Sequence, residues 1–248
     1  MGQSPIVEMK KISKRFGHVV ALDKVDLAIH ESEIVGLVGD NGAGKSTLMK
    51  ILAGVYRLDE GEITWLGRRT DISNPSIARK LGIEVVYQDL ALSTNVDAVA
   101  NVFTGREIIK KTFPWNILGV IDDKIEADET KKVISALGIE LPSVRTSVKY
   151  LSGGQQQLVA IARAIYSRPR VLIMDEPTTA IAVKEKRELL SLVPKFKKEG
   201  VSTVFISHTL QEVFEISDRI VVLSKGIKVN EGSPEELNLE KVMELMMQ

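Results

Sequence analysis

The stretch that decides the fold is GDNGAGKST at residues 39–47, which follows directly on the apolar segment Ile34–Val38. From Gly39 to Ser46 it matches the pattern G-x-x-x-x-G-K-[ST]. The segment before it is typical of a buried strand, and the apolar residues within Leu48–Leu52 have helical spacing. A glycine-rich turn that only opens a helix is the alternative, but the placement between strand and helix favours a phosphate-binding loop.

The chemistry of such a loop explains the residues in it. Glycines let the backbone wrap around a phosphate with its N–H groups pointing inward, and the following helix N-terminus adds positive potential. Lys45 is expected to reach the β- and γ-phosphates, and Ser46 is expected to coordinate Mg²⁺. The residues predicted to bind nucleotide here are Gly39, Asn41, Gly42, Ala43, Gly44, Lys45, Ser46 and Thr47.

A second apolar segment, Val171–Met174, ends in two adjacent acids, Asp175 and Glu176. An acid after a strand can simply cap a helix, but the following residues, Pro177–Thr179, fit a turn. Adjacent carboxylates repel each other, so their pairing is costly unless a cation or a substrate needs them. We expect Asp175 to join the Mg²⁺ shell and Glu176 to polarise an attacking water.

Predicted strands alternate with predicted helices along most of the chain, which favours an α/β fold with a mainly parallel sheet and helices outside it. The predicted strands are Val25–Ile29, Ile34–Val38, Glu62–Leu66, Ile83–Tyr87, Val171–Met174, Val201–Ile206, Ile220–Leu223 and Ile227–Val229. Besides the helix after the phosphate loop, the predicted helices are Pro75–Leu81, Gln155–Ser167, Val183–Lys198, Thr209–Ile216 and Glu235–Met247.

Residues 89 to about 150 differ from the rest, because long strands vanish and Leu, Asn, Asp, Lys and Ala dominate. Val96–Phe103 and Lys124–Leu137 have helical spacing, and Gly138 is a helix stop. We interpret this stretch as a helical insertion into one α/β domain that covers residues 1–248.

Composition narrows the class of protein. The 248 residues contain 33 Lys and Arg and 33 Asp and Glu, so the net charge of zero argues against a dedicated nucleic-acid binder. The absence of cysteine excludes disulfides, thiolate metal sites and Cys nucleophiles. No apolar run approaches the ~20 residues that span a bilayer, and Met1–Ile6 lacks an apolar signal core. We therefore expect a cytoplasmic protein whose membrane role, if any, comes through a partner.

At LSGGQ, residues 151–155, the chain resembles the ATP-binding cassette (ABC) ATPases, and the resemblance covers nearly the whole chain. Three further positions match motifs of that family. Gln88 matches its Q-loop, His208 its switch histidine and Phe16 the aromatic residue that stacks on adenine. Each has a simpler reading: a solvated strand end for Gln88, a surface or capping residue for His208, and ordinary core for Phe16.

The resemblance implies a P-loop cassette that binds ATP and Mg²⁺. Its RecA-like core would comprise 1–88 and 151–248, with an antiparallel β portion, and its helical subdomain about 89–150. The implied catalytic residues are Glu176, His208, Gln88 and Lys45, and the implied Mg²⁺ ligands are Ser46, Gln88 and Asp175. Phe16 would hold the base. Ser152, Gly153, Gly154 and Gln155 would bind the γ-phosphate held by a second copy, because a helix start attracts anions. Two head-to-tail copies would then enclose two ATP molecules.

The chain is most similar to the ATPases of bacterial sugar importers of the ribose, xylose and fructose type. That similarity implies membrane permease subunits as partners, a solute-binding protein acting indirectly, and a place on the inner face of the membrane. An importer for amino acids or another small solute is an alternative, as is a non-transport ABC protein in DNA repair or translation. One departure is Ala182, which stands where most relatives have an Asp that contacts the partner cassette.

One apolar cluster has no place in these motifs. Residues 112–118, TFPWNIL, interrupt an otherwise polar stretch of the helical insertion. They either pack within the insertion or lie on a face that touches the permease, since exposed apolar patches often mark contacts.

Overall fold

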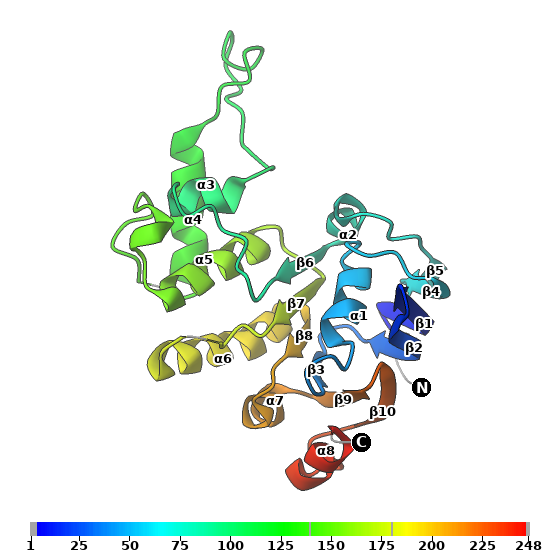
Figure 1. The fold of residues 1–248 in the computed structure, drawn as a ribbon. Helices are drawn as coiled ribbons and strands as arrows, with labels where there is room; N and C mark the ends of the chain where they lie inside the picture. Colours follow the sequence, from blue (N-terminus) through cyan, green and yellow to red (C-terminus); the bar gives the residue numbers. More distant parts are fainter. Residues whose placement is uncertain (1–3, 139, 180, 247–248) are drawn as a thin grey trace. The chain divides into compact units, whose positions relative to one another are not determined.

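The computed structural model describes residues 4–138, 140–179 and 181–246. Three segments considered above lie partly outside the described residues: the N-terminal segment, the loop before Ala182 at residue 180, and the predicted last helix at Met247. The chain, which Figure 1 colours along the sequence, divides into two compact units. The first unit comprises Met1–Gln88, Pro169–Thr179 and Leu190–Gln248, and the second comprises Asp89–Arg168 and Ala180–Leu189.

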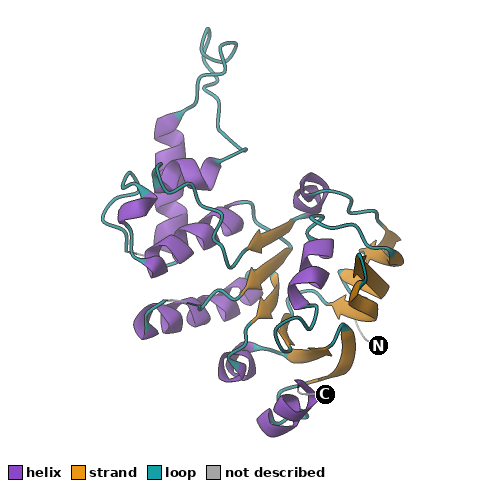
Figure 2. Cartoon of the chain, viewed as in Figure 1, coloured by secondary structure: helices purple, strands orange, loops and turns teal. Residues whose placement is uncertain are grey.

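A six-stranded sheet forms the centre of the first unit (Figure 2). Its order is β10-β9-β3-β8-β7-β6, and every neighbouring pair is parallel except β10 with β9. The strands are β3 (Ile34–Val38), β6 (Ile83–Val86), β7 (Val171–Asp175), β8 (Ser202–Ile206), β9 (Arg219–Ser224) and β10 (Ile227–Gly232). All residues of β3, β7 and β8 are buried, as expected for strands covered on both faces. The predicted α/β fold with a mainly parallel sheet is confirmed.

An antiparallel sheet of four strands, in the order β2-β1-β4-β5, completes the β structure of this unit. The strands are β1 (Val7–Phe16), β2 (Val19–Ile29), β4 (Glu60–Trp65) and β5 (Arg68–Arg69). The sequence did not predict β1, because its alternation of buried and exposed residues breaks after Met9. Lys11 adopts a left-handed conformation there (φ 50°), and the register with β2 shifts before Ile12.

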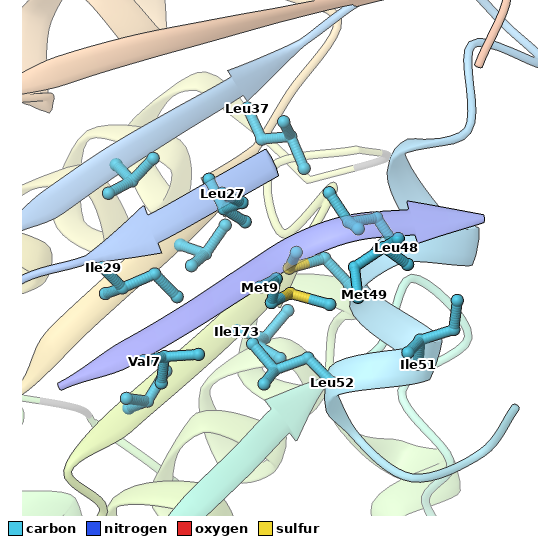
Figure 3. Close-up of a cluster of buried hydrophobic side chains, with 14 of the residues drawn as sticks. Val7, Met9, Leu27, Ile29, Leu37, Leu48, Met49, Ile51, Leu52 and Ile173 are labelled. Atoms are coloured by element: carbon cyan, nitrogen blue, oxygen red, sulfur yellow. The ribbon is translucent and has the colours of Figure 1, made fainter. Parts of the chain in front are cut away.

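One apolar core joins the two sheets of the first unit through α1 (Lys45–Leu52). Figure 3 shows side chains of this helix lying beside side chains of β1, β2 and β3. The labelled members are Val7, Met9, Leu27, Ile29, Leu37, Leu48, Met49, Ile51, Leu52 and Ile173. The helix directly after the phosphate loop is therefore held by packing, which fixes where the loop stands.

The first unit also holds α2 (Pro75–Leu81), α7 (Leu210–Ile216) and α8 (Leu239–Met246). The last helix begins four residues later than predicted. Ser233 and Glu236 form a local turn, in which each main-chain N–H donates to the other's side chain. Asn238 then caps the helix by accepting from the Lys241 N–H at 2.8 Å.

The second unit contains α3 (Ala98–Phe103), α4 (Asp123–Ala136), a short 3₁₀ turn (Val148–Tyr150), α5 (Gly153–Tyr166) and the first half of α6 (Val183–Lys198). Its small apolar core includes Ala98, Val148, Leu151 and Val159. The predicted insertion of about 89–150 lies within this unit, which in addition takes in α5 and residues 180–189. No helix in the described part of the chain is both long and apolar enough to cross a bilayer.

Candidate functional site

The phosphate loop leads from β3 into α1 and depends on glycine at two points. Gly39 (φ 154°) and Gly44 (φ 99°) have positive φ. A Cβ on Gly39 would lie 2.3 Å from the Leu223 carbonyl oxygen, and one on Gly44 would lie 2.7 Å from that of Ala21. Any side chain at either position would force the loop away from the neighbouring backbone, so both glycines are needed for its shape.

Lys45 lies underneath this loop, with only 7% of its surface exposed. Its ammonium donates to the carbonyl oxygens of Gly39, at 2.7 Å, and Asp40, at 3.0 Å. Burial lowers the pKa of Lys45, while the nearby carboxylates of Asp175 and Glu176 oppose that change. The loop thus holds a positive charge next to the helix N-terminus, which suits a polyphosphate.

Ser46 and Asp175 meet at the end of β7, where the Ser46 hydroxyl donates to Asp175 Oδ1 at 3.5 Å. Burial, and after it the charge of Glu176, raise the pKa of Asp175. A nearby cation would stabilise the charged form of this carboxylate. Hydroxyl and carboxylate oxygens are also the kind of ligand that Mg²⁺ prefers. Among the described residues, no group of three or more His, Cys, Asp or Glu could hold a metal. A Mg²⁺ ion here would take its other ligands from phosphate oxygens and water.

Glu176 follows Asp175 in a left-handed conformation (φ 50°). Its N–H donates to the Ile206 carbonyl oxygen at 3.0 Å, so the turn is anchored to β8. Its Oε2 accepts from the Thr179 hydroxyl at 3.1 Å and lies 2.9 Å from His208 Nδ1. The structure therefore brings two predicted catalytic residues into direct contact. With Nδ1 engaged by the carboxylate, Nε2 is the ring atom left for another group.

A buried carboxylate connects the loops that carry these two residues. Glu212, in α7, accepts from the Thr178 hydroxyl at 2.6 Å and from the Ser207 hydroxyl at 3.1 Å. Thr178 is two residues after Glu176, and Ser207 directly precedes His208. Because all three members of this network are buried, its hydrogen bonds hold the two loops in register. Sequence reasoning missed Glu212, which lacks a motif of its own.

Phe16 ends β1 and is 43% exposed, so it is not ordinary core. Its ring forms a T-shaped pair with the ring of Tyr56, with centroids 5.2 Å apart, and Lys14 Nζ lies 5.6 Å from the Phe16 centroid. Tyr56 was not foreseen, and it supports the ring from one side. Gln88 is an exposed residue two positions after β6.

The signature residues lie in the second unit, at the start of α5. Ser152 is the N-cap, and it forms a reciprocal capping box with Gln155 at 3.1 and 3.0 Å. Its hydroxyl also donates to Glu185 Oε1 at 2.9 Å. A Cβ on Gly154 would lie 2.1 Å from the Glu185 carboxyl carbon. A carboxylate therefore already lies on this helix start, which shows that the start accepts an anion.

Glu185 also accepts from the Ala182 N–H at 3.3 Å, as an acid three residues into a helix commonly does. Ala182, where the chain departs from the family pattern, is thus connected through the Glu185 carboxylate to Ser152 at the start of α5. Glu185 was not predicted, because its partner is 33 residues away in the sequence.

The phosphate loop, the strand-end acids and the parallel sheet define a P-loop nucleoside triphosphatase. Residues 22–179 match the family model described as ABC transporter. The chain is 40% identical to the xylose/arabinose import ATP-binding protein XylG of Sulfolobus acidocaldarius, over 98% of this chain and 94% of that protein. It is 38% identical to the fructose import ATP-binding protein FrcA of Rhizobium meliloti, over 99% and 95%.

A solved structure agrees with this match. It is a dimeric, post-hydrolysis state of the ATP-binding cassette MJ0796 bound to ADP and phosphate, with a TM-score of 0.78 and 26% identity. The similarity covers 92% of this chain and 98% of that one. The chain belongs to the ABC transporter family and is one of its ATP-binding cassettes, an ATPase.

Proposed function

We propose that this cassette hydrolyses MgATP to power the uptake of a sugar, of the ribose, xylose or fructose type, through membrane permease subunits. The observation that carries the proposal is the convergence of Ser46, Asp175, Glu176 and His208 at the carboxyl ends of the parallel strands. The names of the two relatives that match over nearly their whole length, XylG and FrcA, support a sugar as the cargo.

In this proposal the phosphate loop holds the nucleotide with its main-chain N–H groups and with Lys45. Phe16 stacks on the base. Ser46, Asp175 and Gln88 would hold Mg²⁺, which when bound neutralises phosphate charge. Glu176 accepts a hydrogen bond from the attacking water and draws its proton. His208 keeps Nδ1 on Glu176 and offers Nε2 to the γ-phosphate.

A second copy supplies the other half of each site. Ser152, Gly153, Gly154 and Gln155 would meet the γ-phosphate held by the first copy's loop, because their helix start already accepts the Glu185 carboxylate. The solved dimer of a similar cassette supports such a pair. The assembly would lie on the inner face of the membrane through its permease and would receive solute from a binding protein outside, without nucleic acid.

Uptake by cells tests the proposal. A strain without the coding sequence is complemented with wild type or with Lys45→Ala, and the influx of labelled xylose, ribose, fructose and amino acids is measured. We expect wild type to restore uptake of one sugar, and Lys45→Ala to restore none. Restored uptake of an amino acid alone would overturn the sugar assignment, and undiminished uptake with Lys45→Ala would overturn the ATPase mechanism.

A further inference from the structure

The second unit carries an exposed apolar loop that the proposed function does not use. Residues 104–122 extend away from α3 and α4 (Figure 1). We call residues 112–119 the apolar tip. Its large side chains are strongly exposed: Phe113 by 79%, Ile117 by 74%, Leu118 by 66% and Trp115 by 47%. The cluster therefore does not pack within the insertion, contrary to the first of its two predicted roles.

The apolar tip is held by its own main chain rather than by a core. At its base, the Lys110 N–H donates to the Val120 carbonyl oxygen at 2.8 Å. Within it, the Asn116 N–H donates to Thr112 at 3.0 Å, and the Leu118 N–H donates to Pro114 at 3.2 Å. The backbone is thus ordered while the side chains face solvent. Such exposure of apolar surface is costly unless another surface covers it.

Charge on the loop indicates what kind of surface that is. The acids of the loop, Glu107 and Asp122, lie at its two ends, and the part between them contains two lysines, Lys110 and Lys111, and no acid. The lysines directly precede the apolar tip, which has no charged residue of its own. Tryptophan favours the boundary between acyl chains and headgroups, phenylalanine and leucine are typical of the apolar face of segments that lie there, and lysine favours anionic headgroups.

We propose that the apolar tip inserts into the interface of an anionic lipid bilayer, with Lys110 and Lys111 on the headgroups. Lys111 and all residues of the apolar tip are exposed, so a deformable surface such as a bilayer can surround the tip on every side. The combination of apolar side chains with a short basic segment gives two independent contributions to binding. This contact would hold the second unit at the membrane independently of ATP.

Trp115 reports directly on the contact. The chain has two tryptophans, and Trp65 is buried in β4, so Trp65→Phe leaves Trp115 as the only tryptophan, which is excited selectively at 295 nm or above. This variant is mixed with phosphatidylglycerol–phosphatidylcholine vesicles, with phosphatidylcholine vesicles, and with vesicles whose acyl chains are brominated. We expect a blue shift with the anionic vesicles, and quenching by the bromine atoms. No shift and no quenching with anionic vesicles would overturn the proposal.

Variants separate the two contributions in a vesicle co-sedimentation assay. Lys110→Ser with Lys111→Ser should weaken binding to anionic vesicles roughly thirtyfold at low salt, because each basic residue contributes about fivefold. Phe113→Ser with Ile117→Ser should weaken binding at least tenfold at any salt concentration. Met243→Ser, on α8, is the control, because Met243 is exposed as much as Trp115.

Two results in this assay would overturn the lipid contact. Unchanged sedimentation of the tip variants would exclude lipid insertion, and binding only to vesicles that contain the permease would make the tip a protein contact. MgATP hydrolysis is measured in parallel and should be unchanged in all tip variants. If the wild type does not hydrolyse MgATP, the proposed function is contradicted but the lipid contact is not. A failure of the proposed function can therefore be told apart from a failure of the lipid contact.

Discussion

Replacing Glu176 with Gln tests the chemistry most sharply. Glu176 Oε2 accepts from Thr179 and lies 2.9 Å from His208 Nδ1. The amide retains an oxygen that can accept both hydrogen bonds, so the turn should keep its shape while the negative charge is lost. Removal of a positioned base typically lowers the rate ~10²–10⁴-fold, which corresponds to about 3–5 kcal/mol in the barrier.

The assay is single-turnover hydrolysis of MgATP, with nucleotide affinity measured separately by a fluorescent ATP analogue. We expect a rate at least 100-fold below wild type and an affinity within about twofold, because Lys45 and Ser46 are untouched. Glu240→Gln, on the exposed side of α8, is the control. Near-normal turnover would refute the role of Glu176 as the group that activates water.

The same variant reports on pairing. Because hydrolysis would open the pair, Glu176→Gln should accumulate as an ATP-bound dimer, whereas wild type stays largely monomeric without its permease. Size-exclusion chromatography with light scattering, with and without MgATP, measures this. A monomer at saturating MgATP would contradict the pairing of cassettes, while turnover alone decides the role of Glu176.

Substitutions at four further residues test the rest of the site. Phe16→Ala should raise the KM for ATP several-fold and leave kcat nearly intact, because stacking on a base contributes ~1–3 kcal/mol; steady-state kinetics checks this. Glu212→Ala should lower kcat at least tenfold and the free energy of unfolding by about 1–3 kcal/mol, since two buried hydroxyls lose their acceptor, and Glu212→Gln should recover part of both. Gly154→Ala places a methyl group where the Glu185 carboxylate now lies, so the carboxylate must shift, and the methyl group on the helix start should reduce the ATP-dependent dimer seen by light scattering. Asp175→Asn should raise the melting temperature without nucleotide, because the raised pKa marks a costly buried charge, and should abolish the additional stabilisation by Mg²⁺ with ATP.

The pKa of Asp175 also gives the sign of a pH effect. Burial raises this pKa in the folded chain, so the folded state binds the proton more tightly than the unfolded state. Its contribution therefore favours folding below the unfolded pKa and is lost as the pH rises through the folded pKa. Without nucleotide, wild type should lose stability relative to Asp175→Asn over that window, and thermal unfolding at a series of pH values measures the difference.

Most of the fold could be predicted because its local signals are strong. The helix Pro75–Leu81 has the predicted bounds, since Asn74 caps it by accepting from the Ile77 N–H and Gly82 ends it with a positive φ. The strand Ile34–Val38 was equally clear from its apolar sequence, and the structure buries all five of its residues. β1 was missed because the left-handed Lys11 interrupts its alternation.

The residues of the site that local motifs define could also be predicted, whereas contacts between residues distant in the sequence could not. Motifs with fixed spacing identified the phosphate loop and the acids at the end of β7. The hydrogen bonds of Glu185 to Ser152 and of Glu212 to Thr178 join residues 33 and 34 positions apart, and no spacing rule predicts them. The pKa changes of Lys45 and Asp175 depend on burial, which only the folded chain defines.

The most direct test of the central claim is ATP-driven accumulation of labelled sugar in proteoliposomes that contain the permease, the solute-binding protein and this chain. The account predicts accumulation of a sugar of the xylose, ribose or fructose type with wild type and MgATP, and none with Glu176→Gln. Accumulation that survives Glu176→Gln, or hydrolysis that proceeds at the same rate with every sugar and moves none of them, would contradict it.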